Sequence, residues 1–270
     1  MNKIKRGAIV TKISDNKNVL FKVERIIKNS KKEEALLKGL FVRIIEKIAV
    51  KELRVVNRKE VNKYIEYTNK LLEKRIYNRR NAEYLKRIRT GKILHIDGDK
   101  KYTEKSYKYY KKLGLNAIVK YVPEEKQEMY IIQLLSKYRP DILVITGHDG
   151  MIKKGRFFND IYNYINSRYF VNTVRRAREW DSRKELVIFA GACQSYYEAL
   201  MSAGANFASS PARVLIDFAD PLIVAEKIAI TDNNYYVTIN DIAGELRDGK
   251  DGVGGVGARG KSKKNYNNVT

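Results

Sequence analysis

Cys193 and His148 are the residues of this chain whose types and surroundings are best suited to catalysis. Cys193 is the single cysteine, and it follows an apolar run, Leu186 to Ala190, through the small residues Gly191 and Ala192. This pattern predicts a buried strand, a tight turn, and a helix that opens at Cys193. Unpaired N–H groups and the macrodipole at a helix N-terminus favour an anion and lower the pKa of a thiol. The sequence therefore predicts a thiolate nucleophile at Cys193.

His148 stands just past a second apolar run, in the phrase PDILVITGHDG from Pro140 to Gly150. The carboxyl ends of neighbouring parallel strands meet at one edge of a sheet, where reaction sites gather. We therefore expect the imidazole to face the thiol, although 45 residues separate them (193 minus 148). In that arrangement the sulfur attacks a peptide carbonyl to give a thioester acyl-enzyme, and the histidine serves as general acid and then as general base.

Each of these residues also has a structural interpretation. A lone cysteine after an apolar strand is commonly an inert buried thiol. A lone histidine beside such a strand is commonly a core residue with satisfied hydrogen bonds. His95, the other histidine, lies inside the expected strand KILHIDG and competes with His148 for the catalytic role. The glycine before His148, and the Asp and Gly after it, favour an exposed turn at that position.

Four phrases in order, LHIDGD, KYRPDILVITGHDG, LVIFAGACQS and AGANFASSPARV, resemble the YabG family of sporulation-specific peptidases of endospore-forming bacteria. The strand endings in Gly-His and Ala-Cys also resemble the wider clan of caspase-like cysteine peptidases, which includes caspases, legumains, clostripain, gingipains and separases. The resemblance covers most of the chain and implies a cysteine endopeptidase with a Cys193/His148 dyad. It implies protein substrates among spore-coat proteins and germination-protein precursors, and a place in the mother-cell cytoplasm, associated with the forming spore coat.

The resemblance leaves the oxyanion donors partly open. The backbone N–H of Cys193 is one candidate. The wider clan usually has glycine directly after the histidine, whereas Asp149 intervenes here before Gly150, so either Asp149 or Gly150 supplies the second N–H. No acidic third member of the site is assigned, because Asp149 either orients the histidine or lines the substrate cleft.

The end of the first catalytic strand often supplies, in this clan, a charge that reads the side chain before the cut bond. Asp97 and Asp99 fill that place, and relatives with an acid there cleave after Arg or Lys, so the resemblance implies cleavage after a basic residue. The alternative is that Asp-Gly-Asp is simply a turn. Asp217 and Asp220, after the expected strand FASS, are second choices for substrate binding.

Composition limits the classes open to this protein. With 270 residues and 44% hydrophobic residues, the chain can bury a sizeable core. One cysteine cannot form an internal disulfide, and two histidines cannot complete a Cys/His-rich zinc site, so we expect no metal and no cofactor. No apolar run is long enough to cross a bilayer, and the start MNKIKRGAIVTKIS lacks the apolar core of a secretory signal. We therefore expect no membrane partner.

A net charge of +23, from 54 basic and 31 acidic residues, attracts polyanions. Nucleic acid as the main partner is disfavoured, because the basic residues are spread along the chain and no zinc-finger, RNA-binding or helix-turn-helix signature is present. Two alternatives to the peptidase stay open. One is a non-enzymatic basic adaptor that binds nucleic acid or acidic spore-coat components, and the other is an acyl transferase that uses the same dyad.

The pattern predicts four regions. Residues 1–57 hold short β-rich segments typical of a small SH3-like β-barrel, which either caps the structure or recruits a partner. Residues 58–90 predict a basic helical connector. Residues 91–246 alternate strand and helix, which predicts the α/β class, with a caspase-like parallel-rich sheet flanked by helices on both faces. Residues 247–270 are rich in Gly, Lys and Asn and predict a flexible tail.

The tail carries the basic residues Arg247, Lys250 and Arg259. A mobile segment with basic residues suits an enzyme that cleaves after Arg or Lys. The sequence therefore also suggests the hypothesis of self-processing within the tail.

Overall fold

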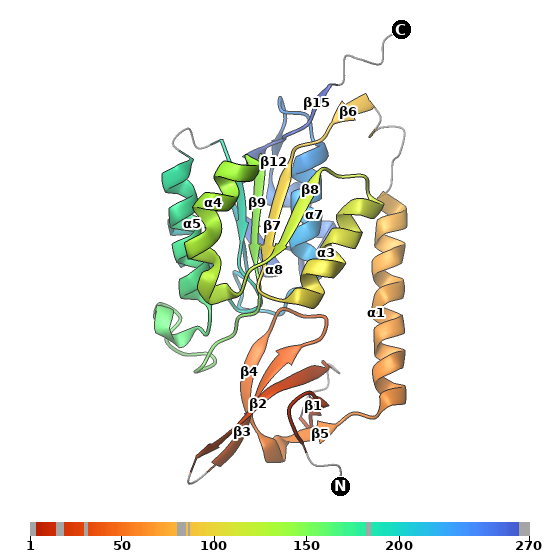
Figure 1. Cartoon of the computed structure of the whole chain (residues 1–270), viewed down its shortest axis with the longest axis vertical. Helices are drawn as coiled ribbons and strands as arrows, with labels where there is room; N and C mark the ends of the chain where they lie inside the picture. Colours follow the sequence, from red (N-terminus) through yellow and green to blue (C-terminus); the bar gives the residue numbers. More distant parts are fainter. Residues whose placement is uncertain are drawn as a thin grey trace.

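A computed structural model of the chain describes residues 4–14, 19–29, 32–79, 85, 87–181 and 185–264. A small antiparallel sheet near the N-terminus lies below a larger, parallel-rich sheet that is flanked by helices, and helix α1 runs along one side (Figure 1). The predicted α/β class, with a parallel-rich sheet between helices after an N-terminal β region, is confirmed.

The N-terminal sheet has five antiparallel strands in the order β4-β3-β2-β1-β5. They are β1 (Ile9–Lys12), β2 (Phe21–Asn29), β3 (Lys32–Gly39), β4 (Ile45–Ala49) and β5 (Leu53–Val55), with the 3₁₀ turn η1 (Val50–Glu52) before the last. Burial alternates along β3, as expected when one face of a strand covers a core and the other meets solvent. The apolar face holds Val10, Val23, Ala35 and Leu37.

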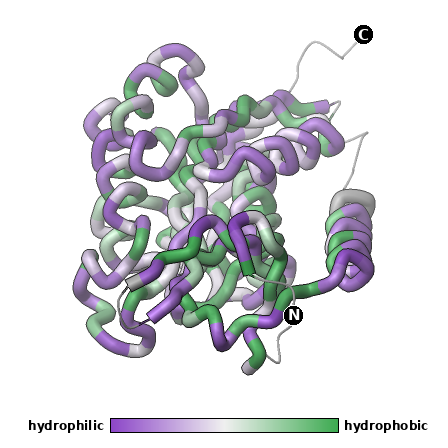
Figure 2. The backbone as a smooth tube through the Cα atoms, turned by 60° about the horizontal axis from the view of Figure 1, so that its bottom comes forward, coloured by the Kyte–Doolittle hydropathy of each residue, from purple (hydrophilic) through white to green (hydrophobic). Residues whose placement is uncertain are grey.

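Helix α1 (Arg58–Arg79) links the two sheets. Asn57 begins it as an N-cap whose side-chain oxygen accepts the N–H of Glu60 at 2.9 Å. Its tube in Figure 2 mixes hydrophilic and hydrophobic colours, as for a helix with one face against the protein. Of the rest of the predicted connector, residues 80–84 and 86 lie outside the described residues, and Ile88–Arg89 is strand β6.

The larger sheet has the order β13-β11-β10-β9-β7-β8. Its strands are β7 (Ile93–Asp97), β8 (Ala117–Tyr121), β9 (Ile142–Thr146), β10 (Val187–Ala190), β11 (Phe207–Ser209) and β13 (Val253–Gly255). The first five are parallel to one another, and β13 runs antiparallel to β11. Strands β7, β9 and β10 are buried along their whole length, which is typical of parallel strands covered on both faces.

Helices cover both faces of this sheet (Figure 1). On one face lie α3 (Lys100–Lys112) and α7 (Asp220–Ile230), which share a core with Tyr109 and Phe207. On the other lie α4 (Gln127–Tyr138), α5 (Ser167–Trp180) and α6 (Tyr197–Ser202), which share a core with Leu143 and Ile188.

The short elements complete the connections between these layers. They are η2 (Glu124–Lys126), η3 (Ile161–Asn163), β12 (Tyr236–Val237), η4 (Ile239–Asp241), η5 (Ala243–Glu245), α8 (Gly249–Gly252), β14 (Ala258–Arg259) and β15 (Lys263–Lys264). Strands β12 and β14 pair with each other, as do β15 and β6. Residues 152–160 form turns and loop.

The prediction of a flexible tail from residue 247 is wrong for its described part. Val253–Gly255 forms an edge strand of the main sheet against β11, and Val253 is fully buried. Glycine permitted this placement, because a Cβ at Gly255 would overlap the carbonyl oxygen of Asn206. Gly-rich composition had suggested disorder, but here it allows close backbone packing. Residues 265–270 lie outside the described residues.

Among the described residues, no helix combines the length and the apolar character that crossing a bilayer requires.

Gly255→Ala should destabilise the fold by about 1–3 kcal/mol, because the added methyl group must displace backbone of β11. Gly244→Ala is the matched control, since a Cβ at that position meets no atom within 4 Å. Thermal unfolding of the two variants measures the difference. Equal midpoints would show that the tail does not form part of the sheet.

Candidate active site

The catalytic candidates lie beyond the carboxyl ends of two neighbouring strands, β9 and β10, which pair in parallel register with Ala190 opposite Ile145. His148 follows the first and Cys193 the second. The N–H groups of Cys193 and Asp149 both donate to one atom, the carbonyl oxygen of Arg43, at 3.1 Å each. The two strand-end loops therefore meet at a single oxygen atom, which comes from the loop between β3 and β4.

Cys193 does not open a helix, so that prediction is wrong. It lies in a turn in which Gln194 has φ of 55°, a left-handed conformation that interrupts a right-handed helix, and α6 begins only at Tyr197. The sulfur accepts the N–H of Ile216 at 3.2 Å. Without a helix terminus, burial dominates, and it raises the pKa of the Cys193 thiol to about 12 instead of lowering it.

The His148 ring is completely buried and stacks on Tyr102, with ring centroids 5.2 Å apart. Its Nε2 lies 3.5 Å from the carbonyl oxygen of Gly39, and its Nδ1 has no hydrogen-bond partner. Burial, with the nearby positive charge of Lys38, lowers the pKa of the imidazole to about 4. Neither ring nitrogen forms a hydrogen bond with the sulfur of Cys193. Without a partner of opposite charge, the buried imidazole and the buried thiol are both neutral at pH 7.

His95 has the surroundings of a core histidine. Its Nε2 lies 2.7 Å from the hydroxyl oxygen of Thr146, and its Nδ1 lies 3.2 Å from that of Tyr110. Burial lowers its pKa. With both ring nitrogens engaged inside the sheet, His95 has no free position toward a substrate.

Asp97 ends β7 and is fully buried in contact with an arginine from the N-terminal sheet. Its carboxylate accepts Nη1 of Arg43 at 2.6 Å and the hydroxyl of Thr146 at 2.7 Å. Burial alone would raise the pKa of Asp97, but the Arg43 guanidinium holds it well below its usual range. The Arg43 side chain is itself completely buried, with its guanidinium 4.8 Å from the Tyr102 ring and 5.5 Å from the Phe218 ring.

The other acidic candidates stabilise local backbone. Asp99 is the N-cap of α3, where its carboxylate accepts the N–H groups of Lys101 and Tyr102. Asp220 accepts the N–H groups of Asp217 and Arg247 and is fully buried. Asp217 accepts the N–H of Ala219, and its backbone pairs with Val42.

The Asp149 carboxylate fixes the loops around the site and does not contact the His148 ring. It accepts the hydroxyls of Ser167 at 2.5 Å and Ser195 at 2.9 Å, and the N–H groups of Asn166 and Gly150. Burial raises the pKa of Asp149 to about 6, against the effect of these hydrogen bonds. Since the N–H of Gly150 is used here, only Asp149 joins Cys193 in pointing an N–H at the Arg43 carbonyl.

Sequence reasoning missed Arg43, Tyr102 and Glu124. Arg43 had a recognisable signal, since it is the one charged residue in the apolar run LFVRII. Glu124 accepts the N–H of His148 at 2.9 Å and presses on Gly98 and Gly147, where any Cβ would overlap its carboxylate. The glycines of HIDGD and TGHDG therefore make room for this buried acid.

The described residues contain no group of three or more His, Cys, Asp or Glu side chains arranged to hold a metal ion. What the site contains is a thiol, an imidazole, two convergent N–H donors and a buried carboxylate that holds a guanidinium. These groups suit acyl transfer from a peptide with an arginine side chain.

The family described as YabG peptidase U57 matches residues 5–267. The sporulation-specific protease YabG of Bacillus subtilis (strain 168) is 49% identical over 142 residues, which are 52% of this chain and 49% of that protein. The chain thus spans about half the length of this curated relative. No solved structure matches the chain.

Alkylation of Cys193 by iodoacetamide at pH 8 should be at least about a hundredfold slower in the folded chain than in the chain unfolded in urea, because the thiolate reacts and burial disfavours it. Mass spectrometry of the modified cysteine over time measures both rates. The unfolded chain is the control, because it contains the same single thiol. Equally fast labelling of the two would contradict the buried, neutral thiol.

Proposed function

This chain belongs to the YabG peptidase family, and on that premise we propose that it is a cysteine endopeptidase with Cys193 as nucleophile and His148 as acid–base partner. One observation carries the proposal. Arg43 makes two kinds of contact: its carbonyl oxygen accepts the N–H groups of Cys193 and Asp149, and its guanidinium pairs with Asp97. A substrate arginine before the cut bond needs this combination of contacts.

In the proposed reaction, the Cys193 thiol gives its proton to neutral His148, and the sulfur attacks the carbonyl carbon of the residue before the cut bond. The tetrahedral oxyanion is stabilised by the N–H groups of Cys193 and Asp149. Protonated His148 gives its proton to the leaving amine, and a thioester remains. His148 then takes a proton from water, and the resulting hydroxide attacks the thioester. The acid is released as His148 returns the proton to the departing sulfur, which restores the thiol.

The unpartnered Nδ1 of His148 supports the acid–base role, because a buried ring nitrogen without a hydrogen bond is free to exchange a proton with the reacting groups. Stacking on Tyr102 fixes the His148 ring, and the hydrogen bond from the His148 N–H to Glu124 fixes its backbone. The thiol proton need not be lost while the site is closed. Entry of water removes the burial that now raises the thiol pKa.

We propose Asp97 as the residue that selects Arg or Lys. Its carboxylate is buried and carries a charge-assisted hydrogen bond from a guanidinium, which is the geometry expected at the base of a pocket for a basic side chain. Asp99, Asp217 and Asp220 each accept hydrogen bonds from backbone N–H groups, which favours a structural role.

Substrates and cellular place rest on similarity to a protein that is named a sporulation-specific protease. We propose spore-coat proteins and germination-protein precursors as substrates, and action in the mother-cell cytoplasm at the forming spore coat. Self-processing in the tail also stays a proposal. Lys250 lies in α8 and Arg259 in the paired strand β14, so cleavage there first requires local opening.

The second candidate is a basic adaptor for nucleic acid or acidic coat components. Two observations favour it: the net charge of +23, and a thiol that burial keeps protonated. An adaptor needs no catalytic thiol. Replacing Cys193 therefore distinguishes the two functions, because it would abolish peptide hydrolysis and leave binding by an adaptor intact.

Cys193→Ala and His148→Ala should each reduce hydrolysis of arginyl peptide amides to background, because either change removes a group that reacts. Release of a fluorescent amine measures the rate, and thermal unfolding checks that each variant is folded. Arg25→Ala, on an exposed part of β2, is the control for a substitution outside the site and should leave the rate unchanged. Retained hydrolysis in Cys193→Ala would refute the cysteine mechanism.

Asp97→Asn should lower kcat/KM for arginyl peptides by about 30-fold or more, since a buried charge pair contributes 2–5 kcal/mol when one partner is truncated. Asp99→Asn keeps a good N-cap for α3 and tests Asp99 as the alternative residue of the specificity pocket. A peptide library that varies the residue before the cut bond measures the cleavage preference of each variant. A changed preference in Asp99→Asn alone would assign the pocket to Asp99.

A further inference from the structure

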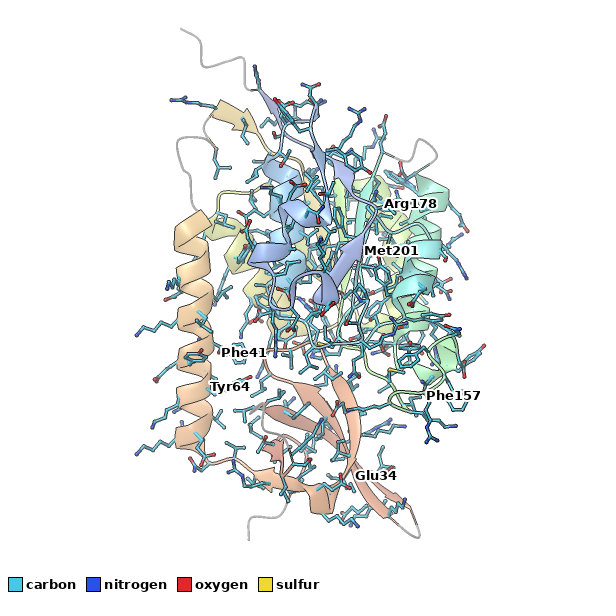
Figure 3. All side chains as sticks on the ribbon, turned by 180° about the vertical axis from the view of Figure 1, so that it is seen from behind. Glu34, Phe41, Tyr64, Phe157, Arg178 and Met201 are labelled. Carbon is cyan, nitrogen blue, oxygen red and sulfur yellow. The ribbon has the colours of Figure 1, made fainter. Side chains whose placement is uncertain are left out.

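The Arg43 contacts belong to a hairpin loop, residues 40–44, that joins β3 to β4. Lys38 pairs with Ile45 at the base of the loop, and the N–H of Gly39 donates to the carbonyl of Ile44 at 2.9 Å. Both ends of the loop are thereby held by one scaffold, the N-terminal sheet. Phe41, labelled in Figure 3, lies where this sheet meets the α/β region, close to Tyr64 of α1, with ring centroids 5.5 Å apart.

The loop pairs with the α/β region through its backbone on both sides of Arg43. Before Arg43, Val42 forms an antiparallel bridge with Asp217, and the N–H of Phe218 donates to the carbonyl of Phe41 at 3.3 Å. After Arg43, the N–H of Ile45 donates to the carbonyl of Asp149 at 2.9 Å. An extended peptide held by backbone hydrogen bonds, with one side chain in a pocket, is the common way in which proteins bind peptides as added strands.

The loop leaves the site inaccessible. Val42 is 3% exposed, Arg43 and Ile44 are 0% exposed, and so are Cys193 and His148. The carbonyl oxygens of Gly39 and Val42 both accept the hydroxyl of Tyr102, the ring on which His148 stacks. A second peptide cannot reach the sulfur while these contacts persist.

We propose that the loop 40–44 is a built-in inhibitor: Arg43 occupies the specificity pocket of the chain's own active site, and the intact protein is latent until the N-terminal sheet withdraws this loop. The proposal rests on the proposed function and specifies how that same site is regulated. The natural occupant of the cleft is thus an arginine in an extended, apolar segment, which is also the chemistry expected of a substrate.

A purely structural ion pair explains the contacts less well. Arg43 Nε and Nη2 are buried without hydrogen-bond partners, and leaving a buried donor unsatisfied destabilises the folded state. Buried ion pairs are also weak sources of stability. The Arg43–Asp97 contact therefore combines specific recognition with an incomplete set of hydrogen bonds, as suits a group that must leave.

Tethering explains how an incompletely bonded loop still closes the site. The loop and the cleft belong to one chain, so closing is an intramolecular event with a high effective concentration and little further loss of freedom. A separate substrate peptide has to compete with it. Because the hairpin base at Lys38 and Ile45 holds both flanks, the loop resembles a preorganised inhibitor more than a flexible substrate.

Arg43→Ala tests the inhibitor loop in the full-length chain. Its initial rate on a fluorogenic arginyl peptide amide should exceed that of the wild type at least tenfold, and iodoacetamide should label Cys193 faster by a similar factor. Arg25→Ala, the matched control on β2, should change neither rate more than twofold. Equal rates for wild type and a folded Arg43→Ala in both assays would overturn the proposal.

Tyr102→Phe keeps the ring that stacks on His148 and removes the two hydrogen bonds to the loop. This variant replaces Arg43→Ala as the test of the loop if Arg43→Ala does not fold. It should accelerate iodoacetamide labelling of Cys193 several-fold. Unchanged labelling in this variant would count against the loop as a cover. Faster labelling without peptide hydrolysis in any variant would refute the peptidase, and with it the inhibitor role, while still supporting the loop as a cover over Cys193.

Discussion

The buried contact between Arg43 and Asp97 is the interaction on which the arrangement of this protein depends. It removes two charges from water, which is costly unless they meet at close range, and they meet at 2.6 Å. The pair holds the β3–β4 loop against the carboxyl edge of the larger sheet. With the guanidinium fixed there, the Arg43 carbonyl reaches the N–H groups of both strand-end loops.

The protonation of the site follows from that closure. Once the loop excludes water, desolvation raises the pKa of the Cys193 thiol and lowers that of the His148 imidazole, so each group holds its neutral form. A helix terminus or a direct thiolate–imidazolium pair would oppose these shifts, but neither is present. The same closure that gives substrate-like contacts therefore also keeps the Cys193 thiol, the proposed nucleophile, in its unreactive neutral form.

Asp149 organises the loops around the candidate site. It directly follows His148, and its carboxylate accepts hydrogen bonds from Ser167 and Ser195. Those two serines belong to the start of α5 and to the cysteine loop, so one side chain ties three segments together. Its backbone N–H remains directed at the Arg43 carbonyl, where the oxyanion proposal requires a donor.

The order of apolar and polar residues is enough to predict the parallel-rich sheet and the edge at which Cys193 and His148 lie. Continuous apolar runs alternating with helical patterns leave little freedom in an α/β fold, and parallel pairing forces the two strand ends to one side. Local composition misled at two places. Gly-rich residues near Gly255 form an edge strand, and a left-handed Gln194 delays the helix expected at Cys193.

The occupant of the site, Arg43, could be identified only from long-range packing. Arg43 and Asp97 are 54 residues apart in the chain, one in the loop between β3 and β4 and the other at the end of β7, and no periodicity or propensity links them. The burial that sets the thiol and imidazole pKa values arises from that same long-range contact, so it too is absent from any local pattern. Propensity and periodicity act over neighbouring residues, whereas desolvation depends on everything that packs around a group.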